Sequence, residues 1–193
     1  MMPLGVDFCR ALNVAGIGKT VIEIGSKPAP GQETLANLRP IFGAEEYVGI
    51  DIEAGPGVDI VCDGTRLKTI FQRREFELGL CIDTLEHCWE PGIIVKQLIA
   101  VSEHVALRVP FSCPVHDHPY DYWRFTTETV ARWLKESRLS HGFVAKDPPL
   151  FSYPGEWPNG VYGFGTSEST VRVDVVKALQ ARPARDIMIT EIW

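Results

Sequence analysis

Long hydrophobic runs are missing from this sequence. No stretch of the 193 residues approaches the ~18 consecutive apolar residues that a membrane-spanning helix requires, so we expect no membrane span. The first residues of the chain, 1–18, contain no long apolar segment of the kind found in secretory signal peptides. These two absences predict a cytoplasmic protein.

An excess of positive charge is also missing. The chain has 19 Lys and Arg against 25 Asp and Glu, a formal net charge of −6 at pH 7. Proteins that bind phosphate backbones usually carry a basic stripe. The nearest approach to one is formed by Arg66, Lys68, Arg73 and Arg74, which we interpret as a solvated helix face. Nucleic acid is therefore an unlikely partner, and a small acceptor molecule is favoured.

Paired cysteine motifs are absent as well. The five cysteines are odd in number and include no CxxC pair, which favours reduced thiols over a disulfide framework. Residue types that bind zinc do occur, and Cys113 and His116 have ligand-like spacing. The full set of such residues is His87, Cys88, Cys113, His116 and His118. Because no second pair accompanies them, no metal site is predicted.

The first two thirds of the chain alternate between short apolar, β-branched runs and helical patterns. Strands are expected over 20–25, 47–52, 58–62, 76–82 and 105–109, with helices over 6–15, 32–38, 65–72 and 92–102. Such alternation is typical of an α/β fold. We therefore predict a mostly parallel sheet of about seven strands with helices on both faces.

The last third of the chain does not continue this regular alternation of strands and helices. A helix over 127–137 with Thr126 as N-cap, a strand over 142–146, a helix over 171–181 and a final strand over 186–193 are expected. The segment 148–169 is rich in Pro, Gly and aromatic residues and is interpreted as a long surface insertion. We predict one domain over 1–193, with a core at 20–147, an insertion at 148–184 and the final strand at 185–193.

Four residues fall at the predicted carboxyl ends of strands: Gly25, Asp51, Asp63 and Asp83. The carboxyl ends of parallel strands share one edge of a sheet, where ligands bind. A carboxylate in the position of Asp51 can accept hydrogen bonds from both ribose hydroxyls of an adenosine, as in a nicotinamide cofactor or S-adenosylmethionine. The loop from Gly25 to Gly31 contains two prolines and lacks GxGxxG spacing, which disfavours a pyrophosphate and hence NAD.

The runs Val21-Ile-Glu-Ile-Gly25, Tyr47-Val-Gly-Ile-Asp51, Val61-Cys-Asp63 and Cys81-Ile-Asp-Thr-Leu-Glu-His87 resemble class I S-adenosylmethionine-dependent methyltransferases. Within these, the chain resembles the type 11 methyltransferase-domain group. The later run Val109-Pro-Phe, with His116, Pro119 and Asp121-Tyr-Trp-Arg-Phe-Thr126, is similar to a subgroup of that family. The resemblance covers about residues 20–137 and implies a Rossmann-like fold. It departs from the family where the usual acidic-x-Gly-x-Gly-x-Gly loop is reduced to Glu23-Ile-Gly25-Ser-Lys-Pro, and where the Pro-Gly turn before the fifth strand is replaced by Val101-Ser-Glu-His104.

The resemblance implies S-adenosyl-L-methionine as cofactor and assigns residues to its parts. Glu23, Gly25 and Ser26 would surround the methionine group, Asp51 and Ile52 the ribose, Asp63 and Gly64 the adenine, and Asp83 would lie between the methionine group and the acceptor. Transfer from a sulfonium needs alignment and exclusion of water more than a fixed catalytic triad.

A small-molecule or glycan-type acceptor is expected beside this site. His116 is the candidate general base, because histidine titrates near neutrality, and Asp83 is the second candidate catalytic residue. The candidate acceptor-binding residues are His87, His116, Tyr122, Arg124 and Trp157. Arg124 could instead pair with Asp121 or Glu128. The alternative functions are a catalytically inactive methyltransferase-like scaffold and, less favoured, an NAD-dependent oxidoreductase or a zinc protein; the oligomeric state is left open.

Overall fold

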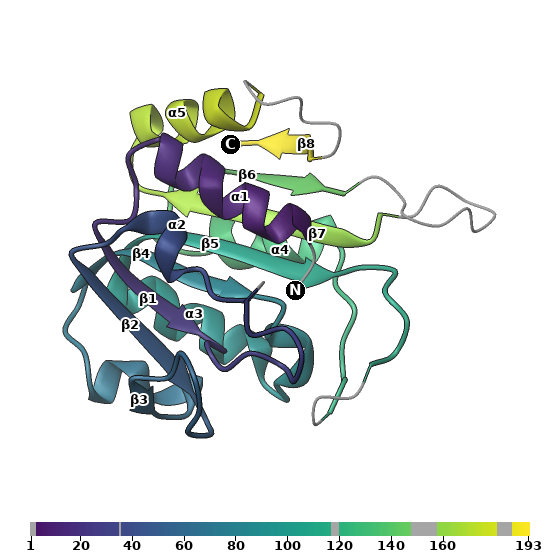
Figure 1. Ribbon diagram of the computed structural model, residues 1–193. Helices are drawn as coiled ribbons and strands as arrows, with labels where there is room; N and C mark the ends of the chain where they lie inside the picture. The colour runs from purple at the N-terminus through teal and green to yellow at the C-terminus, as the bar shows by residue number, and fades with distance from the viewer. Residues whose placement is uncertain (1–2, 35, 117–119, 148–157, 181–186) are drawn as a thin grey trace.

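The computed structural model describes residues 3–34, 36–116, 120–147, 158–180 and 187–193. They form one eight-stranded sheet in the order β3-β2-β1-β4-β5-β7-β6-β8 (Figure 1). The strands are β1 Thr20–Ile24, β2 Glu46–Asp51, β3 Ile60–Val61, β4 Phe76–Ile82, β5 Ser102–Pro110, β6 His141–Lys146, β7 Gly160–Thr166 and β8 Met188–Ile192. The helices are α1 Pro3–Val14, α2 Arg39–Phe42, α3 Pro91–Val101, α4 Thr127–Lys135 and α5 Ser169–Gln180, with 3₁₀ turns η1 Gly64–Thr69 and η2 Leu85–His87.

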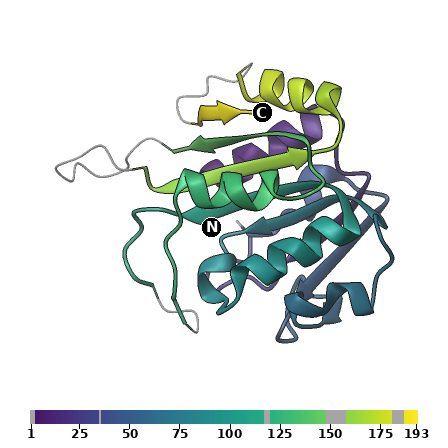
Figure 2. The same ribbon diagram turned by 180° about the vertical axis from the view of Figure 1, so that it is seen from behind.

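The predicted α/β architecture is confirmed, with eight strands in place of about seven. The first five strands pair in parallel, whereas β7 runs antiparallel to β5 and β6, and β8 antiparallel to β6. Helices α1, α2 and α5 cover one face of the sheet, and α3 and α4 cover the other (Figures 1 and 2). None of the helices among the described residues is long and apolar enough to cross a membrane.

The sheet is buried on both sides, which explains why its central strands read as continuous apolar runs. On one face the core is built by residues such as Ile22, Leu98 and Val130, and on the other by residues such as Phe8, Leu80 and Phe164. Thr126 caps α4 as predicted, because its hydroxyl accepts a hydrogen bond from the Thr129 N–H at 3.3 Å. Most of the predicted helices and strands begin and end within a few residues of the bounds expected from the sequence.

The prediction of a surface insertion over 148–169 is wrong for its second half. Gly160–Thr166 forms β7, whose seven residues are all buried between β5 and β6. Glycine is uncommon in strands, but a Cβ at Gly163 would lie 2.4 Å from Val130 and one at Gly165 would lie 2.8 Å from Leu139. These glycines let α4 and the turn after it pack directly on the strand. Residues 148–157 lie outside the described part of the chain.

The predicted helix over 32–38 is also wrong. Its described residues, 32–34 and 36–38, form a loop with turns, and the helix α2 begins only at Arg39. Pro40 lies in the first turn of α2, where its missing N–H would have no intrahelical partner in any case. Proline therefore starts this short helix instead of ending an earlier one, and the connection from β1 to β2 is mostly loop.

Candidate functional site

Strands β3, β2, β1 and β4 are parallel neighbours, so their carboxyl ends lie along one edge of the sheet. Asp51 is the last residue of β2, while Gly25 and Asp83 directly follow β1 and β4. The predicted shared edge is confirmed. Strands β2 and β3 lie on one side of β1, and the next strand in the chain, β4, lies on its other side. The strand order therefore reverses direction at β1, and ligands bind at such a switch point, at the carboxyl ends of the strands.

Gly25 turns the chain sharply at the end of β1. Its φ is +78°, in the left-handed region, and an added Cβ would lie 2.1 Å from Thr84 Oγ1. Its N–H and that of Ser26 both donate to the carbonyl of Ile50, at 2.8 and 3.1 Å. Only glycine fits this position. The hydroxyl of Ser26 is buried without a hydrogen-bond partner among the described residues.

Asp51 is oriented by backbone groups. Its two carboxylate oxygens accept single hydrogen bonds from the N–H groups of Lys27 and Glu53, at 3.2 and 3.1 Å. Each oxygen keeps further acceptor capacity, and the side chain is partly exposed. Ile52, the next residue, presents an exposed apolar side chain. The pair offers what a nucleoside needs, a bidentate acceptor beside an apolar surface.

Asp63 and Gly64 lie beyond the end of β3. The Asp63 carboxylate caps η1 by accepting a hydrogen bond from the Thr65 N–H at 2.8 Å. Gly64 is buried, and a Cβ there would lie 3.2 Å from Ile24 and 3.4 Å from Ile94. Asp63 therefore caps the turn, and Gly64 lets it pack closely against Ile24 and Ile94. Their assignment to an adenine stays a prediction.

Glu23 has a buried side chain that faces a cavity of about 280 Å³ beneath the loop after β1. The Tyr47 hydroxyl donates a hydrogen bond to its carboxylate at 2.7 Å. Burial raises the pKa of Glu23 to about 7, from 4.5, and the Tyr47 hydrogen bond opposes this only in part.

Glu23 is expected to make the protein less stable as the pH rises. Because the folded state holds the Glu23 proton more tightly than the unfolded chain, the free energy of unfolding falls between about pH 4.5 and pH 7, by about 3 kcal/mol for this group. In Glu23→Gln, which keeps an acceptor for Tyr47, that dependence disappears. Urea unfolding at pH 4.5, 6 and 8 measures it, and a gap between the two proteins that does not change with pH contradicts it.

Asp83 belongs to a buried charged network. It has a φ of +51°, and it forms an ion pair with Arg108 of β5. Arg108 also reaches Asp147 at 3.4 Å, and Asp147 accepts a hydrogen bond from the Tyr162 hydroxyl at 2.6 Å. The second oxygen of Asp83 is buried and has no partner among the described residues. The network fixes Asp83 between β4 and β5 at the ligand edge.

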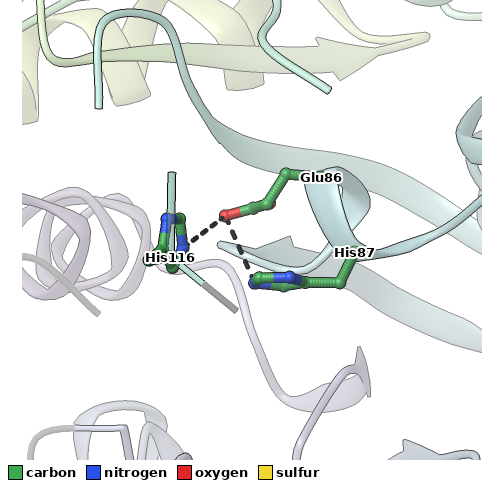
Figure 3. Close-up of side chains that lie close together, drawn as sticks. All are labelled: Glu86, His87 and His116. Carbon is green, nitrogen blue, oxygen red and sulfur yellow. Dashed lines mark ion pairs between the residues drawn. The ribbon is translucent and has the colours of Figure 1, made fainter. Parts of the chain in front are cut away.

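Glu86 and His87 lie in η2 directly after β4, and His116 reaches them from the loop after β5 (Figure 3). One oxygen of the buried Glu86 carboxylate lies 3.8 Å from Nε2 of His87 and 3.9 Å from Nε2 of His116. The two imidazoles meet edge to face, with centroids 5.2 Å apart. Burial, followed by the negative charge of Asp83, raises the pKa of Glu86 to about 8. The predicted acceptor residues His87 and His116 are thus brought together around a carboxylate that the prediction did not include.

Arg124 acts inside the loop between β5 and α4. It pairs with the buried Asp121 carboxylate, with one contact at 2.7 Å, and it donates to the carbonyls of Cys113 and Pro114 at 2.8 and 2.9 Å. The pKa of Asp121 falls well below its usual range, first because of its hydrogen bond from Arg124. Since all three guanidinium nitrogens already donate to the protein, the geometry favours the Asp121 pairing over an acceptor contact.

An exposed aromatic patch borders the histidines and consists of Trp89, Tyr120, Tyr122 and Trp123. The Trp89 and Tyr122 rings meet edge to face at 5.3 Å, and those of Tyr120 and Tyr122 stack at 5.6 Å. The patch is tied to the histidine cluster, because the Tyr122 N–H donates to the Glu86 carbonyl at 2.8 Å. Trp89 and Tyr120 were missed by the sequence prediction. Trp157, which it included, lies outside the described residues, as does His118.

No family model and no curated protein matches the chain. Several solved structures have a fold similar to that of this chain. A possible histamine N-methyltransferase of Thermotoga maritima, described as S-adenosylmethionine-dependent, has 12% identity and a TM-score of 0.57, over 83% of this chain and 89% of its own. An S-adenosylmethionine-dependent methyltransferase of Archaeoglobus fulgidus has 13% identity and a TM-score of 0.58, over 79% and 87% of the two chains. The N-terminal domain of EvdMO1, solved with S-adenosylhomocysteine bound, has 18% identity and a TM-score of 0.58, over 87% and 83%.

This chain has the fold of S-adenosylmethionine-dependent methyltransferases. The fold-level part of the resemblance found in the sequence is thereby confirmed, while the type 11 subgroup stays a prediction. In the methyltransferase fold of this chain, the ligand edge carries Gly25, Asp51 and Asp83, and the Glu86 cluster with its aromatic patch adjoins the same edge at β4 and β5.

Proposed function

We propose that the chain transfers a methyl group from S-adenosyl-L-methionine to a small-molecule or glycan-type acceptor. The observation that carries the proposal is the arrangement of Gly25 and Asp51 at the ends of adjacent parallel strands. Gly25 lets the chain turn sharply at the end of β1, where a Cβ would clash with Thr84, and Asp51 offers a bidentate acceptor next to it. The likeness to methyltransferases of known structure supports the same assignment.

The residues at the edge fit this cofactor. Ser26 Oγ and Asp83 Oδ2 are buried polar atoms that have no hydrogen-bond partner in the described part of the chain, and a bound ligand would satisfy them. Acidic groups suit a ligand whose sulfonium and ammonium groups are positive. We assign Glu23, Gly25, Ser26 and Asp83 to the methionine part, Asp51 and Ile52 to the ribose, and Asp63 and Gly64 to the adenine.

When bound, the cofactor supplies an electrophilic methyl group, and the electron pair of the broken carbon–sulfur bond remains on sulfur. The protein has to orient the acceptor and receive its proton. We assign the proton to Nε2 of His116, whose Nδ1 lies 3.1 Å from the Pro114 carbonyl and 3.3 Å from Asp121. Asp83, held by Arg108, would orient the reacting groups from the end of β4.

The acceptor would lie against the aromatic patch. Flat exposed rings such as Trp89 and Tyr122 pack well on the apolar faces of sugars and other ring compounds. Together with the net charge of −6, this favours a small ring-shaped or glycan acceptor over a nucleic acid.

Asp51→Ala tests the proposal. It removes a charged partner of two ribose hydroxyls, so affinity for S-adenosylhomocysteine should fall by about 1–3 kcal/mol, or roughly 5- to 150-fold. Glu46→Ala is the matched control, because Glu46 is an exposed acid at the opposite end of the same strand. Calorimetric titration of the three proteins measures the effect. Equal affinity in all three removes Asp51 from the site, and no binding in any favours the inactive-scaffold alternative.

A further inference from the structure

The side chains of Glu86, His87 and His116 converge on one point (Figure 3). Their nearest ligand atoms, one from each side chain, all lie within 4.8 Å of one another. The Glu86 side chain is 1% exposed, while His116, at 44%, opens the cluster to solvent. The second carboxylate oxygen of Glu86 has no hydrogen-bond partner among the described residues. A buried carboxylate between two imidazoles therefore lacks a donor that satisfies it.

The Nδ1 atom of each imidazole already has a backbone carbonyl as its hydrogen-bond partner. Nδ1 of His87 is hydrogen-bonded to the Tyr120 carbonyl, and Nδ1 of His116 lies 3.1 Å from the Pro114 carbonyl. Because a carbonyl oxygen only accepts, the proton of each neutral ring is on Nδ1. Each Nε2 then presents a lone pair to the same oxygen of Glu86. Backbone acceptors hold metal-binding histidines in this way in many proteins.

The charge balance around the cluster also calls for a cation. Arg108 is a single positive charge shared between Asp83 and Asp147. Among the described residues, no Lys or Arg nitrogen forms an ion pair with Glu86. Three carboxyl groups, those of Asp83, Asp147 and Glu86, therefore lie in this part of the protein with one arginine. Buried charge of this kind is normally paired or coordinated to a metal.

We infer that Glu86, His87 and His116 bind a divalent transition-metal ion. Two imidazoles and one carboxylate suit Zn²⁺, Fe²⁺, Mn²⁺ or Co²⁺ better than Mg²⁺ or Ca²⁺. Neighbouring ligand atoms around such an ion are about 3.0–3.4 Å apart. The observed 3.8 and 3.9 Å close to that range by small rotations of the two histidines.

Three protein ligands leave coordination positions open, as in catalytic metal sites. Since the aromatic patch borders the cluster, we assign the open positions to oxygen atoms of the acceptor. Adjacent hydroxyl groups on a ring match this arrangement. This assignment rests on the proposed function and changes one role in it, because Nε2 of His116 is a ligand and no longer the base when the ion is bound. The ion would orient the acceptor oxygen and lower the pKa of its hydroxyl group, whose proton would then leave to solvent. Metal binding itself does not depend on it.

Titration of the chelator-treated protein with Co²⁺, followed by visible absorption and calorimetry without cofactor, tests the inference. One equivalent should bind. Affinity should fall at least ~100-fold in His116→Asn and in Glu86→Gln, since removing even an outer-shell partner costs about 10- to 100-fold. His141→Asn, in β6 and outside the cluster, is the matched control and should bind like the unaltered protein. Cys113→Ser should also retain binding, although its sulfur lies 3.8 Å from His116 Nδ1.

Two results would overturn the inference: no saturable Co²⁺ binding, or binding that His116→Asn leaves unchanged. His116 is partly exposed, so that variant should fold even if Glu86→Gln does not. Titration with S-adenosylhomocysteine on the same samples separates the two proposals. Cofactor binding without Co²⁺ binding would contradict the metal site alone, and the reverse would contradict the proposed function alone.

Discussion

Arg108→Leu is expected to lower the free energy of unfolding by about 3–5 kcal/mol, because it leaves Asp83 and Asp147 as buried carboxylates without their positive partner. The Arg108 side chain is 4% exposed, and a Cβ at Gly160 would lie 2.6 Å from its guanidinium, so the charge is enclosed by β5 and β7. Urea unfolding at pH 7 measures the loss.

Two comparisons show whether charge is the cause. Arg132→Leu removes an exposed arginine of α4, whose side chain is 74% exposed, and should change stability by less than about 0.5 kcal/mol. Adding Asp83→Asn and Asp147→Asn to Arg108→Leu removes the unpaired negative charges and should recover part of the loss. If the triple variant is less stable than Arg108→Leu alone, lost packing and not unpaired charge explains the effect.

Gly25→Ala is expected to destabilise the protein by about 2–5 kcal/mol and to reduce cofactor affinity with it. The alanine would have to adopt a φ near +78°, and its Cβ would overlap the Thr84 side chain at 2.1 Å. Relief of that overlap requires movement of either the end of β1 or the η2 turn. Both segments border the proposed methionine position, so binding and stability should be lost together.

Gly31→Ala is the matched control for this substitution. Gly31 lies in the same loop with a φ of +80°, but a Cβ there meets nothing within 4 Å. It should therefore show only the backbone strain, about 1 kcal/mol. Urea unfolding and calorimetric titration with S-adenosylhomocysteine measure both properties. Equal losses in the two variants would show that the contact between Gly25 and Thr84 does not matter.

The parallel half of the sheet could be predicted from sequence because each strand is a local signal. Apolar β-branched runs such as Thr20–Ile24 end in Gly or Asp, and parallel pairing alone brings those ends together. The ligand edge followed from this without knowledge of any side-chain contact. By contrast, β7 could not be predicted, since its glycines make sense only when α4 lies against them.

The second half of the candidate site was beyond local reasoning for a similar reason. His116 lies 30 positions after Glu86 in the sequence, and only the neighbouring positions of β4 and β5 bring the two together. In the sequence Glu86 stands in the run Leu-Glu-His87, and nothing next to it indicates that its carboxylate is buried beside two histidines. The Arg108 network joins β4, β5 and the end of β6. No pattern within a single segment indicates such a set.

Calorimetric titration of the unaltered protein with S-adenosylhomocysteine, with NAD as the comparison ligand, tests the central claim most directly. We expect saturable one-to-one binding of S-adenosylhomocysteine and no binding of NAD, because the loop from Gly25 to Gly31 offers few donors to a pyrophosphate. Binding of NAD alone, or of neither ligand, would contradict the assignment of this edge to S-adenosylmethionine.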